Sequence, residues 1–248
     1  NITMTADTDV NLDQTTLEAL NGGDINVTST GDITLDVTDS GQTIIDPGLQ
    51  SSNRIYDGTS DATGISSFSN ITINSNAVTV AADNITFSDP DVGTNKTVTA
   101  SGVNLTGPGA SDVTLDSSSA TTTADISQAL LTLSSFDAQN KTYDGNDTAD
   151  LTGTVDGSDV IGSDTVNFDT TATGTFDNGG DAGTGINVSF TNSDLLSGTD
   201  AGNYTVSPGA VAADISQALL TLSSFDAQDK TYDGNDTAGL TGAVDGAG

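Results

Sequence analysis

The residues best suited to binding a ligand are carboxylates and amides that lie close together in two short turns. Each turn carries an aspartate, an asparagine and a second aspartate: Asp144, Asn146 and Asp147 in one, and Asp233, Asn235 and Asp236 in the other. Carboxylate and amide oxygens are the ligands that a hard cation such as calcium prefers. The turns lack the closing glutamate of an EF-hand loop, and the alternative is an Asx-type turn that hydrogen-bonds its own backbone. The sequence therefore predicts calcium as one use of these turns, and no cofactor as a requirement.

Three of the four cationic residues occupy one repeated position beside these turns. Each lies two residues before a Tyr-Asp-Gly triplet: Arg54 before Tyr56, Asp57 and Gly58; Lys141 before Tyr143, Asp144 and Gly145; and Lys230 before Tyr232, Asp233 and Gly234. In a chain with a net charge of −31, this coincidence predicts an ion pair or hydrogen bond to an aspartate of the turn or of the neighbouring domain. A Lys–Asn isopeptide cross-link is a second use of such a lysine, although Arg54 cannot form one.

The side chains that most enzymes use are absent. The chain has no cysteine, no histidine and no tryptophan, so the thiol nucleophile, the usual zinc ligands, the usual general base and a tryptophan platform for sugars are all missing. The four tyrosines are too few for such a platform, and we expect them to pack in the core or at a corner. We therefore expect a protein that is not an enzyme.

The charge excludes two classes of partner. With 35 acidic against four cationic residues, the chain has no basic cluster for a nucleic acid backbone or for anionic lipid. No apolar run approaches the length of a membrane span, so membrane insertion is not expected in this segment. Glu18 is the only glutamate, and because aspartate favours turns where glutamate favours helices, the choice of acid indicates a β protein.

These turns belong to a tandem repeat. The stretch Ala124–Gly157 returns at Ala213–Gly246 with three differences, Asn140/Asp229, Asp150/Gly239 and Thr154/Ala243. A diverged third copy of the turn surrounds Tyr56. The chain is therefore an array of repeats rather than one large domain, and neighbouring repeats of the same chain are its first expected partners.

Short alternating apolar runs between turn residues predict an all-β fold. In the second repeat the expected strands are Leu131–Phe136, Leu151–Val155, Thr165–Phe168, Thr173–Phe176, Ile186–Phe190, Tyr204–Val206 and Val211–Ile215. We divide the chain into a first, diverged repeat at residues 47–129, a second at 130–218 and an incomplete third at 219–248, with a linker from Pro47 to Asn53. Because only Ser-Gln-Ala-Leu joins successive repeats, we expect β-sandwiches arranged as a rod.

Residues 1–46 differ in texture, with three-residue apolar segments separated by Gly and Asp turns. This spacing suits the rungs of a parallel β-solenoid, in which each rung pairs with its neighbours. An ordinary antiparallel meander is the alternative for this lead-in segment.

Three motifs resemble one known family. Lys141–Ala149, which returns at Lys230–Ala238, is followed by Asp181–Phe190 and by Asp200–Val206. In this order they resemble the YDG repeat domain of bacterial surface adhesins of the filamentous-haemagglutinin type. The resemblance covers about residues 50–248, although the first repeat departs from it in closing on Ala110–Leu115. It implies tandem immunoglobulin-like β-sandwiches in a stalk, with no catalytic residues, and the lead-in is similar to the solenoid of the same adhesin class.

The expected function is that of a non-enzymatic structural stalk segment of a secreted or surface-anchored bacterial adhesin, providing reach and spacing outside the cell. The alternative is a subunit of an extracellular fibre, a homopolymer joined head to tail by strand complementation. In that arrangement the lead-in strands of one copy complete the incomplete repeat of the next.

Overall fold

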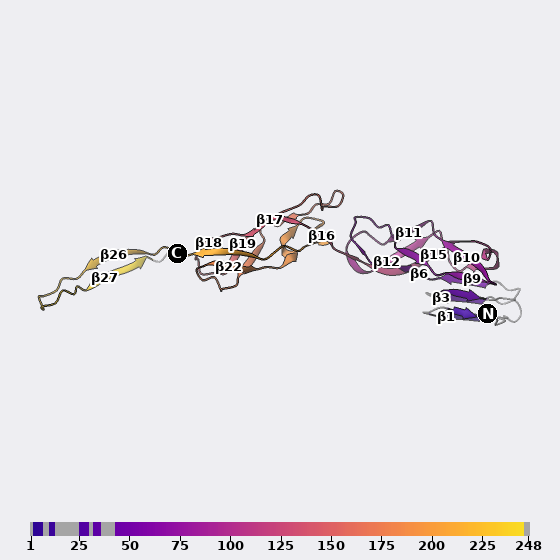
Figure 1. The fold of residues 1–248 in the computed structure, drawn as a ribbon, viewed down its shortest axis with the longest axis horizontal. Helices are drawn as coiled ribbons and strands as arrows, with labels where there is room; N and C mark the ends of the chain where they lie inside the picture. The colour runs from indigo at the N-terminus through magenta and orange to yellow at the C-terminus, as the bar shows by residue number, and fades with distance from the viewer. Residues whose placement is uncertain (1, 7–9, 13–24, 30–31, 36–42, 246–248) are drawn as a thin grey trace. The chain divides into compact units, whose positions relative to one another are not determined.

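The computed structural model describes residues 2–6, 10–12, 25–29, 32–35 and 43–245, and Figure 1 traces them as strands and turns. The predicted all-β class is confirmed, since the described residues form strands and no α-helix. Three short 3-10 turns complete the described elements: η1 (Ala110–Asp112), η2 (Asn192–Leu195) and η3 (Ala201–Asn203). No helix of the described chain is long and apolar enough to cross a membrane.

The described chain forms two compact units. The first comprises Asn1–Ala129 with the short segments Ile161–Ser163 and Gly202–Tyr204, and the second comprises the rest.

The beginning of the first unit is a coil of parallel strands. The first five strands alternate between two sheets. One contains β1 (Ile2–Ala6), β3 (Ile25–Ser29) and β5 (Thr43–Pro47), and the other contains β2 (Val10–Leu12) and β4 (Ile33–Leu35), which the later strand β9 (Ile71–Ile73) extends. β1, β3 and β5 pair in parallel without a register shift, and so do β2, β4 and β9. Ile33, Ile45, Ile71 and Ile73 are almost completely buried here. Because β9 belongs to the first repeat, the sheets run on from the lead-in into that repeat.

The linker expected at Pro47–Asn53 is wrong. Pro47 ends β5 and pairs with Ser29, and β6 (Leu49–Ser51) follows at once, with Leu49 only 4% exposed. Proline at the end of a strand loses no ladder bond that the sheet needs, so Pro-Gly did not interrupt the sheet here.

The rest of the first repeat is mainly antiparallel. Its further strands are β7 (Arg54–Ile55), β8 (Ser66–Phe68), β10 (Asn76–Ala81), β11 (Asn84–Phe87), β12 (Gly93–Ser101), β13 (Asn104–Thr106), β14 (Thr114–Leu115) and β15 (Ser119–Ser127). β11, β12, β15 and β7 form one sheet in that order, in which the short β7 runs parallel to β15.

The second repeat contains a six-stranded sheet in the order β17-β19-β21-β22-β25-β18. Its strands are β17 (Leu133–Ala138), β18 (Lys141–Thr142), β19 (Thr148–Val155), β21 (Thr173–Phe176), β22 (Gly183–Ser189) and β25 (Val211–Ser216), and the other strands are β16 (Ala129–Leu131), β20 (Asn167–Phe168), β23 (Leu196–Ser197) and β24 (Tyr204–Val206). Phe136 packs edge-on against Phe168 and Phe190, with ring centroids 6.3 and 5.0 Å apart. These rings bring β20 and the end of β22 onto β17.

The two repeats place the cationic residue in the same way. Arg54 in β7 pairs in parallel with Ile126 of β15, and Lys141 in β18 pairs with Ile215 of β25. The preceding asparagine, Asn140, accepts a hydrogen bond from the backbone N–H of Asp214 at 2.7 Å, as Asn53 does from Asp125. The short strand is therefore fixed to the last strand of its repeat immediately before the turn.

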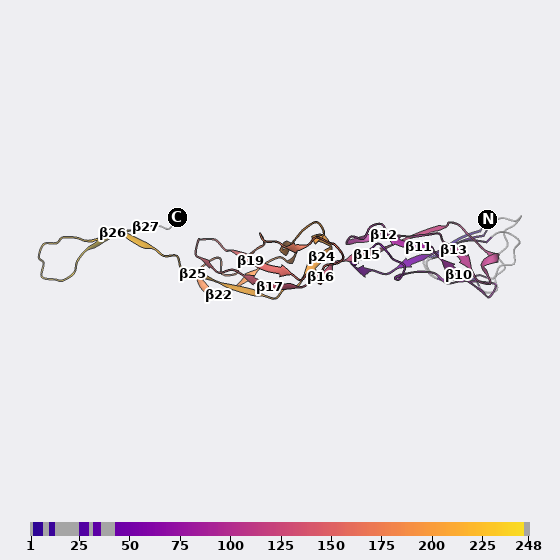
Figure 2. The ribbon, with the colours of Figure 1, turned by 90° about the horizontal axis from the view of Figure 1, so that it is seen from above.

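The third repeat is represented by one antiparallel hairpin, β26 (Thr221–Ala227) and β27 (Leu240–Asp245). It is a single two-stranded layer in both ribbon views (Figure 1, Figure 2). Its register reproduces that of β17 and β19, including the bulge between Ser223 and Asp226.

Candidate functional site: the cation-filled turns

The backbone of each turn is held by its own aspartate and asparagine. In the second repeat, Asp144 Oδ1 accepts from the backbone N–H of Asn146 at 3.1 Å, and Asn146 Oδ1 accepts from that of Thr148 at 3.0 Å. Gly145 has a φ of +81°, a conformation that favours glycine. The turn is thus of the Asx type, one of the two interpretations of the sequence.

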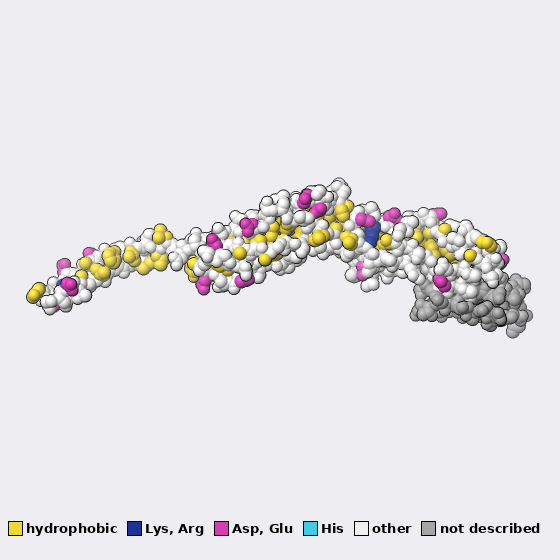
Figure 3. All heavy atoms as spheres, in the orientation of Figure 1, with side chains coloured by type: hydrophobic (Ala, Val, Ile, Leu, Met, Phe, Trp, Pro, Cys, Tyr) yellow, Lys and Arg dark blue, Asp and Glu magenta, His cyan; other side chains and the backbone are white. Residues whose placement is uncertain are grey.

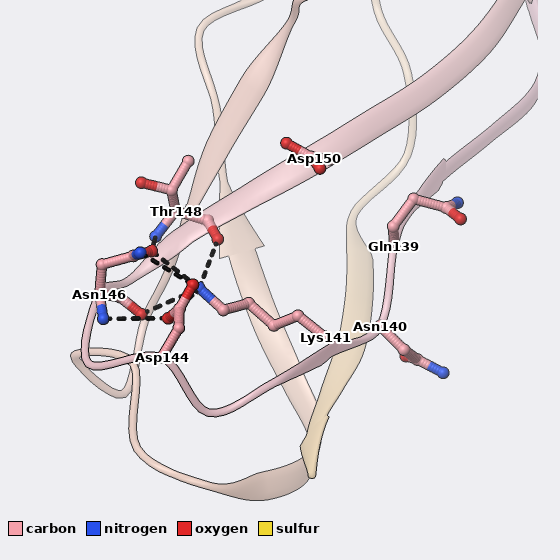
Figure 4. A pocket seen from close by; sticks show the side chains of 7 residues that line it. All are labelled: Gln139, Asn140, Lys141, Asp144, Asn146, Thr148 and Asp150. Atoms are coloured by element: carbon pink, nitrogen blue, oxygen red, sulfur yellow. Dashed lines mark hydrogen bonds and ion pairs between the residues drawn. The ribbon is translucent and has the colours of Figure 1, made fainter. Parts of the chain in front are cut away.

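The lysine before the turn reaches into its centre. Lys141 Nζ lies 2.7 Å from Asp144 Oδ1 and 2.7 Å from Asn146 Oδ1, and it also donates to the carbonyls of Asn146 at 3.1 Å and Thr148 at 3.2 Å. Figure 4 shows these contacts converging on the ammonium group. A carboxylate, an amide and two carbonyls are also what a hard metal cation takes as ligands. The ammonium group therefore occupies the position that the sequence offered to calcium.

The third repeat builds the same cluster. Lys230 Nζ lies 2.8 Å from Asp233 Oδ1, 2.7 Å from Asn235 Oδ1, 2.9 Å from Asn235 O and 3.0 Å from Thr237 O. Gly234 has the same φ of +81° as Gly145. This turn keeps its geometry on a hairpin that the rest of a repeat does not cover.

The first repeat fills the equivalent turn with a guanidinium group. Arg54 Nη1 donates to Asp57 Oδ2 at 3.1 Å and to the carbonyl of Asp61 at 2.8 Å, and Nη2 donates to the carbonyl of Thr59. Gly58 again has a positive φ, +75°. The expected ion pair between the repeated cation and an aspartate of its own turn is present in all three repeats.

A phenylalanine ring lies against the cation in both longer repeats. The Arg54 guanidinium carbon is 4.9 Å from the centroid of the Phe87 ring, and Lys141 Nζ is 5.9 Å from that of Phe176. Both distances suit a cation–π interaction. Sequence reasoning missed these rings. An alignment of the two repeats could have found them, because Phe87 in β11 and Phe176 in β21 occupy equivalent positions.

Gly180 also belongs to the site and was not predicted. A Cβ atom at Gly180 would lie 2.3 Å from the carbonyl oxygen of Asn146, an oxygen that accepts from Lys141, and its φ is +85°. Only glycine fits both the conformation and the close approach. The loop before β22 therefore seals one side of the turn.

The electrostatics follow from this geometry. The hydrogen bond from Lys141 lowers the pKa of the Asp144 carboxyl below its ordinary value of 3.8, and the backbone N–H of Asn146 lowers it further. Lys230 and the N–H of Asn235 act on the pKa of Asp233 in the same direction. The aspartate beside each lysine is thus a charged carboxylate at neutral pH.

The remaining calcium candidates, Asp147 and Asp236, lie beside the clusters in the same turns. Asp147 contributes its backbone carbonyl, which accepts from the N–H of Phe176 at 2.7 Å. Asp236 is exposed on the third-repeat hairpin. Among the residues that the structure describes, no three acidic, histidine or cysteine side chains are grouped to hold a metal ion. Calcium at the turns stays a prediction.

The turn also brings together the three groups of an isopeptide reaction. Asp144 contacts the reactive nitrogen of Lys141 and accepts from Asn146 Nδ2 at 2.9 Å. Amide formation needs a neutral amine that attacks the asparagine carbon, an acid that carries protons and the release of ammonia. The lowered pKa of Asp144 and its 48% exposed side chain leave it a carboxylate at neutral pH, so it does not supply the protonated acid that this reaction needs.

A shallow cavity of about 350 Å³ lies beside the turn. Its lining is polar: Gln139, Asn140, Lys141, Asp144, Asn146, Thr148 and Asp150. Figure 4 shows the Lys141 side chain directed toward Asp144 and Asn146, and away from Gln139. The arrangement satisfies backbone carbonyls and orders a loop.

The four tyrosines divide into two groups. Tyr56 is 6% exposed and its ring meets that of Tyr204 edge-on at 5.5 Å within the first unit, where Tyr204 Oη accepts from the N–H of Ile161 at 2.9 Å. The expectation of core packing is confirmed for these two residues. Core packing is wrong for Tyr143, which is 44% exposed, and for Tyr232, which is 93% exposed; packing of Tyr143 at a corner stays a prediction.

Comparison with known proteins identifies the repeats. The model of the YDG domain matches residues 40–124 and again residues 127–212, which together make up more than half of the chain. No curated protein and no solved structure matches the chain significantly. The chain therefore belongs to the YDG-domain family.

Proposed function

We propose that this chain is a non-enzymatic structural segment whose repeats act as spacers in the stalk of a bacterial surface adhesin. The observation that supports it best is the repetition of one self-contained device, a cation that organises its own turn, in all three repeats. A catalytic or glycan-binding protein needs a distinct site, whereas a spacer needs a unit that can be copied.

The extracellular setting is part of the same proposal. It rests on the resemblance of the motifs to adhesin repeats and on the acidic chain, with its net charge of −31. We also propose that the described strands of the lead-in are rungs of a parallel solenoid, because β1, β3 and β5 pair in parallel without a shift; the rest of residues 1–46 lies outside the described residues. Protease treatment of intact cells, followed by an antibody to residues 130–218, should remove the signal if the array is outside.

A domain exchange in the intact surface protein tests the spacer role. Residues 130–218 are replaced by an unrelated β-domain of similar length, and adhesion is compared with that of a deletion of the same residues. A spacer predicts that the exchange keeps adhesion and that the deletion reduces it. Loss of adhesion in a correctly displayed exchange variant would instead assign binding to the repeat itself.

We also propose that the turns need no metal, since an ammonium or guanidinium group already neutralises their oxygens. A calcium ion would have to displace the lysine from the carboxylate and the carbonyls. The unfolding temperature should therefore be the same in chelator and in millimolar calcium. A higher unfolding temperature in calcium would show that the folded chain binds the metal.

The fibre subunit is the second candidate. The exposed hairpin of the third repeat supports it, because an open strand edge accepts strands from another chain. Less favourable is the pairing of the lead-in, where β3 is bonded on both edges, to β1 and β5, and β5 is bonded to β3 and β14. Polymers that grow with concentration in size-exclusion chromatography would favour the fibre.

A further inference from the structure

The hairpin β26–β27 carries an apolar face that nothing in the described chain covers. Its large side chains are mostly exposed: Leu219 83%, Leu220 60%, Leu222 62%, Phe225 61%, Leu240 61% and Val244 55%. Figure 3 shows hydrophobic side chains gathered along this end of the chain. Contiguous exposed apolar surface marks an interaction site.

In the second repeat the equivalent hairpin is covered, so the exposure of the same side chains can be compared. Leu131 and Leu151 are 2% and 3% exposed, whereas their counterparts Leu220 and Leu240 are 60% and 61% exposed. The sequences agree at these positions, and the strand register is the same in both hairpins. The hairpin is therefore already folded in the form that the later strands of a repeat cover.

Those later strands cover the hairpin of the second repeat in two ways. β21 adds to the free edge of β19, with Ala149 opposite Gly174 and the N–H of Leu151 bonded to the carbonyl of Ala172 at 3.1 Å. Phe168 and Phe190 then pack on Phe136. In the third repeat β27 pairs with β26, and no further strand joins it among the described residues.

One of these rings, that of Phe168, packs directly on a glycine. A Cβ at Gly153 would lie 3.0 Å from two carbons of the Phe168 ring, so the ring rests directly on this glycine. Its counterpart is Gly242, where a Cβ would meet only Phe225 of the same hairpin, at 3.3 Å. The third repeat therefore has the same recess for an incoming phenylalanine, and the recess is open.

The three differences between the repeats leave this face unchanged. Asn140, Asp150 and Thr154 are all exposed in the second repeat, so their replacement by Asp229, Gly239 and Ala243 alters no covered position. The exchange at Asn140 also keeps a function, because an aspartate oxygen can accept the backbone hydrogen bond that Asn140 accepts from Asp214.

We propose that the hairpin 219–245 is an acceptor for the later strands of a YDG repeat, a polypeptide segment with the sequence character of residues 158–216. The segment adds a strand to the edge of β27, inserts a phenylalanine over Gly242 and packs a second one on Phe225. This inference does not depend on the stalk role. It requires only that the covered and uncovered hairpins are equivalent.

The segment that binds the hairpin must have strands that are not already paired with the first hairpin of another repeat. The later strands of the second repeat are paired with β19 and β18 of the same repeat, so those of a second copy of this chain are already engaged. In the lead-in, β3 and β4 are bonded on both edges, and β1 and β2 on one. Residues 1–46 contain no phenylalanine to insert over Gly242, so the lead-in does not supply the missing layer.

A binding measurement tests this directly. A fluorescent peptide of residues 158–216 is titrated with the full chain, and its anisotropy is followed. We expect saturable binding with one peptide per chain. Leu240→Asp, on the apolar face, should weaken binding at least tenfold, whereas Ala243→Asp on the same strand should leave it nearly unchanged, because its counterpart Thr154 is exposed in the complete repeat.

A second experiment does not depend on the solubility of the peptide. Residues 158–218 are fused directly after residue 246, which is equivalent to residue 157 of the second repeat. Hydrogen exchange of the β27 amides is then measured in this extended chain. Amides of Leu240–Asp245 should become protected in the extended chain and should lose that protection with Leu240→Asp.

Three results would overturn the proposal. The first is absence of saturable peptide binding together with unprotected amides in the extended chain. The second is binding that Leu240→Asp leaves intact. The third is a stable dimer of the unmodified chain that buries the hairpin, which would make a second copy the occupant.

Discussion

At the scale of single residues, the central feature is a side-chain cation held in a turn by oxygen atoms of the kinds that a hard metal ion also binds. Lys141 satisfies a carboxylate, an amide and two backbone carbonyls with one ammonium group, and Arg54 serves the equivalent turn with a fork of donors. In a chain with four cationic residues, three are used in this way.

Removing the ammonium group should weaken the second repeat. Lys141→Met leaves the carbonyls of Asn146 and Thr148 without their donor, and we expect a loss of about 1–2 kcal/mol in the free energy of unfolding. Lys141→Arg should lose less, because arginine serves this turn in the first repeat. Calorimetry of both variants tests this, and equal stability of Lys141→Met and the parent chain would contradict it.

The acid side of the pair predicts a pH dependence. The folded pKa of Asp144 lies below its ordinary value of 3.8, so the ion pair stabilises the fold at neutral pH. That contribution decreases as pH falls below the unfolded pKa and through the lowered folded one. Carboxyl NMR titration should show the pKa of Asp144 rising in Lys141→Met. An unchanged pKa in that variant would show that Lys141 is not the cause of the lowered pKa of Asp144.

The charge on the two carboxyl groups also predicts the mass of the protein. Because the pKa values of Asp144 and Asp233 are lowered and both side chains are about half exposed, neither is a protonated acid at neutral pH, so no isopeptide should form. Intact-mass spectrometry should give the mass of the sequence. A mass lower by one or two molecules of ammonia would show that the cross-link forms despite the ion pair.

At the scale of elements, the local sequence pattern predicted where strands lie better than it predicted which segments pair or pack with them. The bounds of β21 and β24 agree with the expected Thr173–Phe176 and Tyr204–Val206, because period-two alternation is a local signal. Pro47 and Gly48 were interpreted as a linker because the partner that holds β5, the parallel strand β3, is distant in sequence. The Phe176 ring against Lys141 was missed for the same reason, since nothing near Lys141 in sequence indicates it.

A pair of glycines tests how the layers pack. Gly153→Val places carbon atoms against the Phe168 ring, which a Cβ alone already approaches to 3.0 Å, and should destabilise the second repeat by about 1–3 kcal/mol. Gly242→Val makes the same change in the uncovered hairpin, and the unfolding temperature of the rest of the chain should hardly move. Similar losses for the two variants in thermal unfolding would show that the packing account is wrong.

At the scale of the whole molecule, the chain is an array in which one design is copied with few changes. Two matches to the YDG domain cover more than half of it, and the third turn repeats the geometry of the second. The family could be predicted from sequence because it rests on repeated motifs, and the all-β class because it rests on local apolar alternation between turn residues. The role as a spacer is a proposal, because it depends on the protein that displays the array.

The most direct test of the spacer role is a series of surface proteins with one, two, three and four copies of residues 130–218. The distance from the cell surface to an epitope beyond the array is measured by super-resolution microscopy. Our account predicts that this distance increases by an equal step with each copy, while binding by the adhesive tip is retained. An epitope height that does not change with copy number would contradict it.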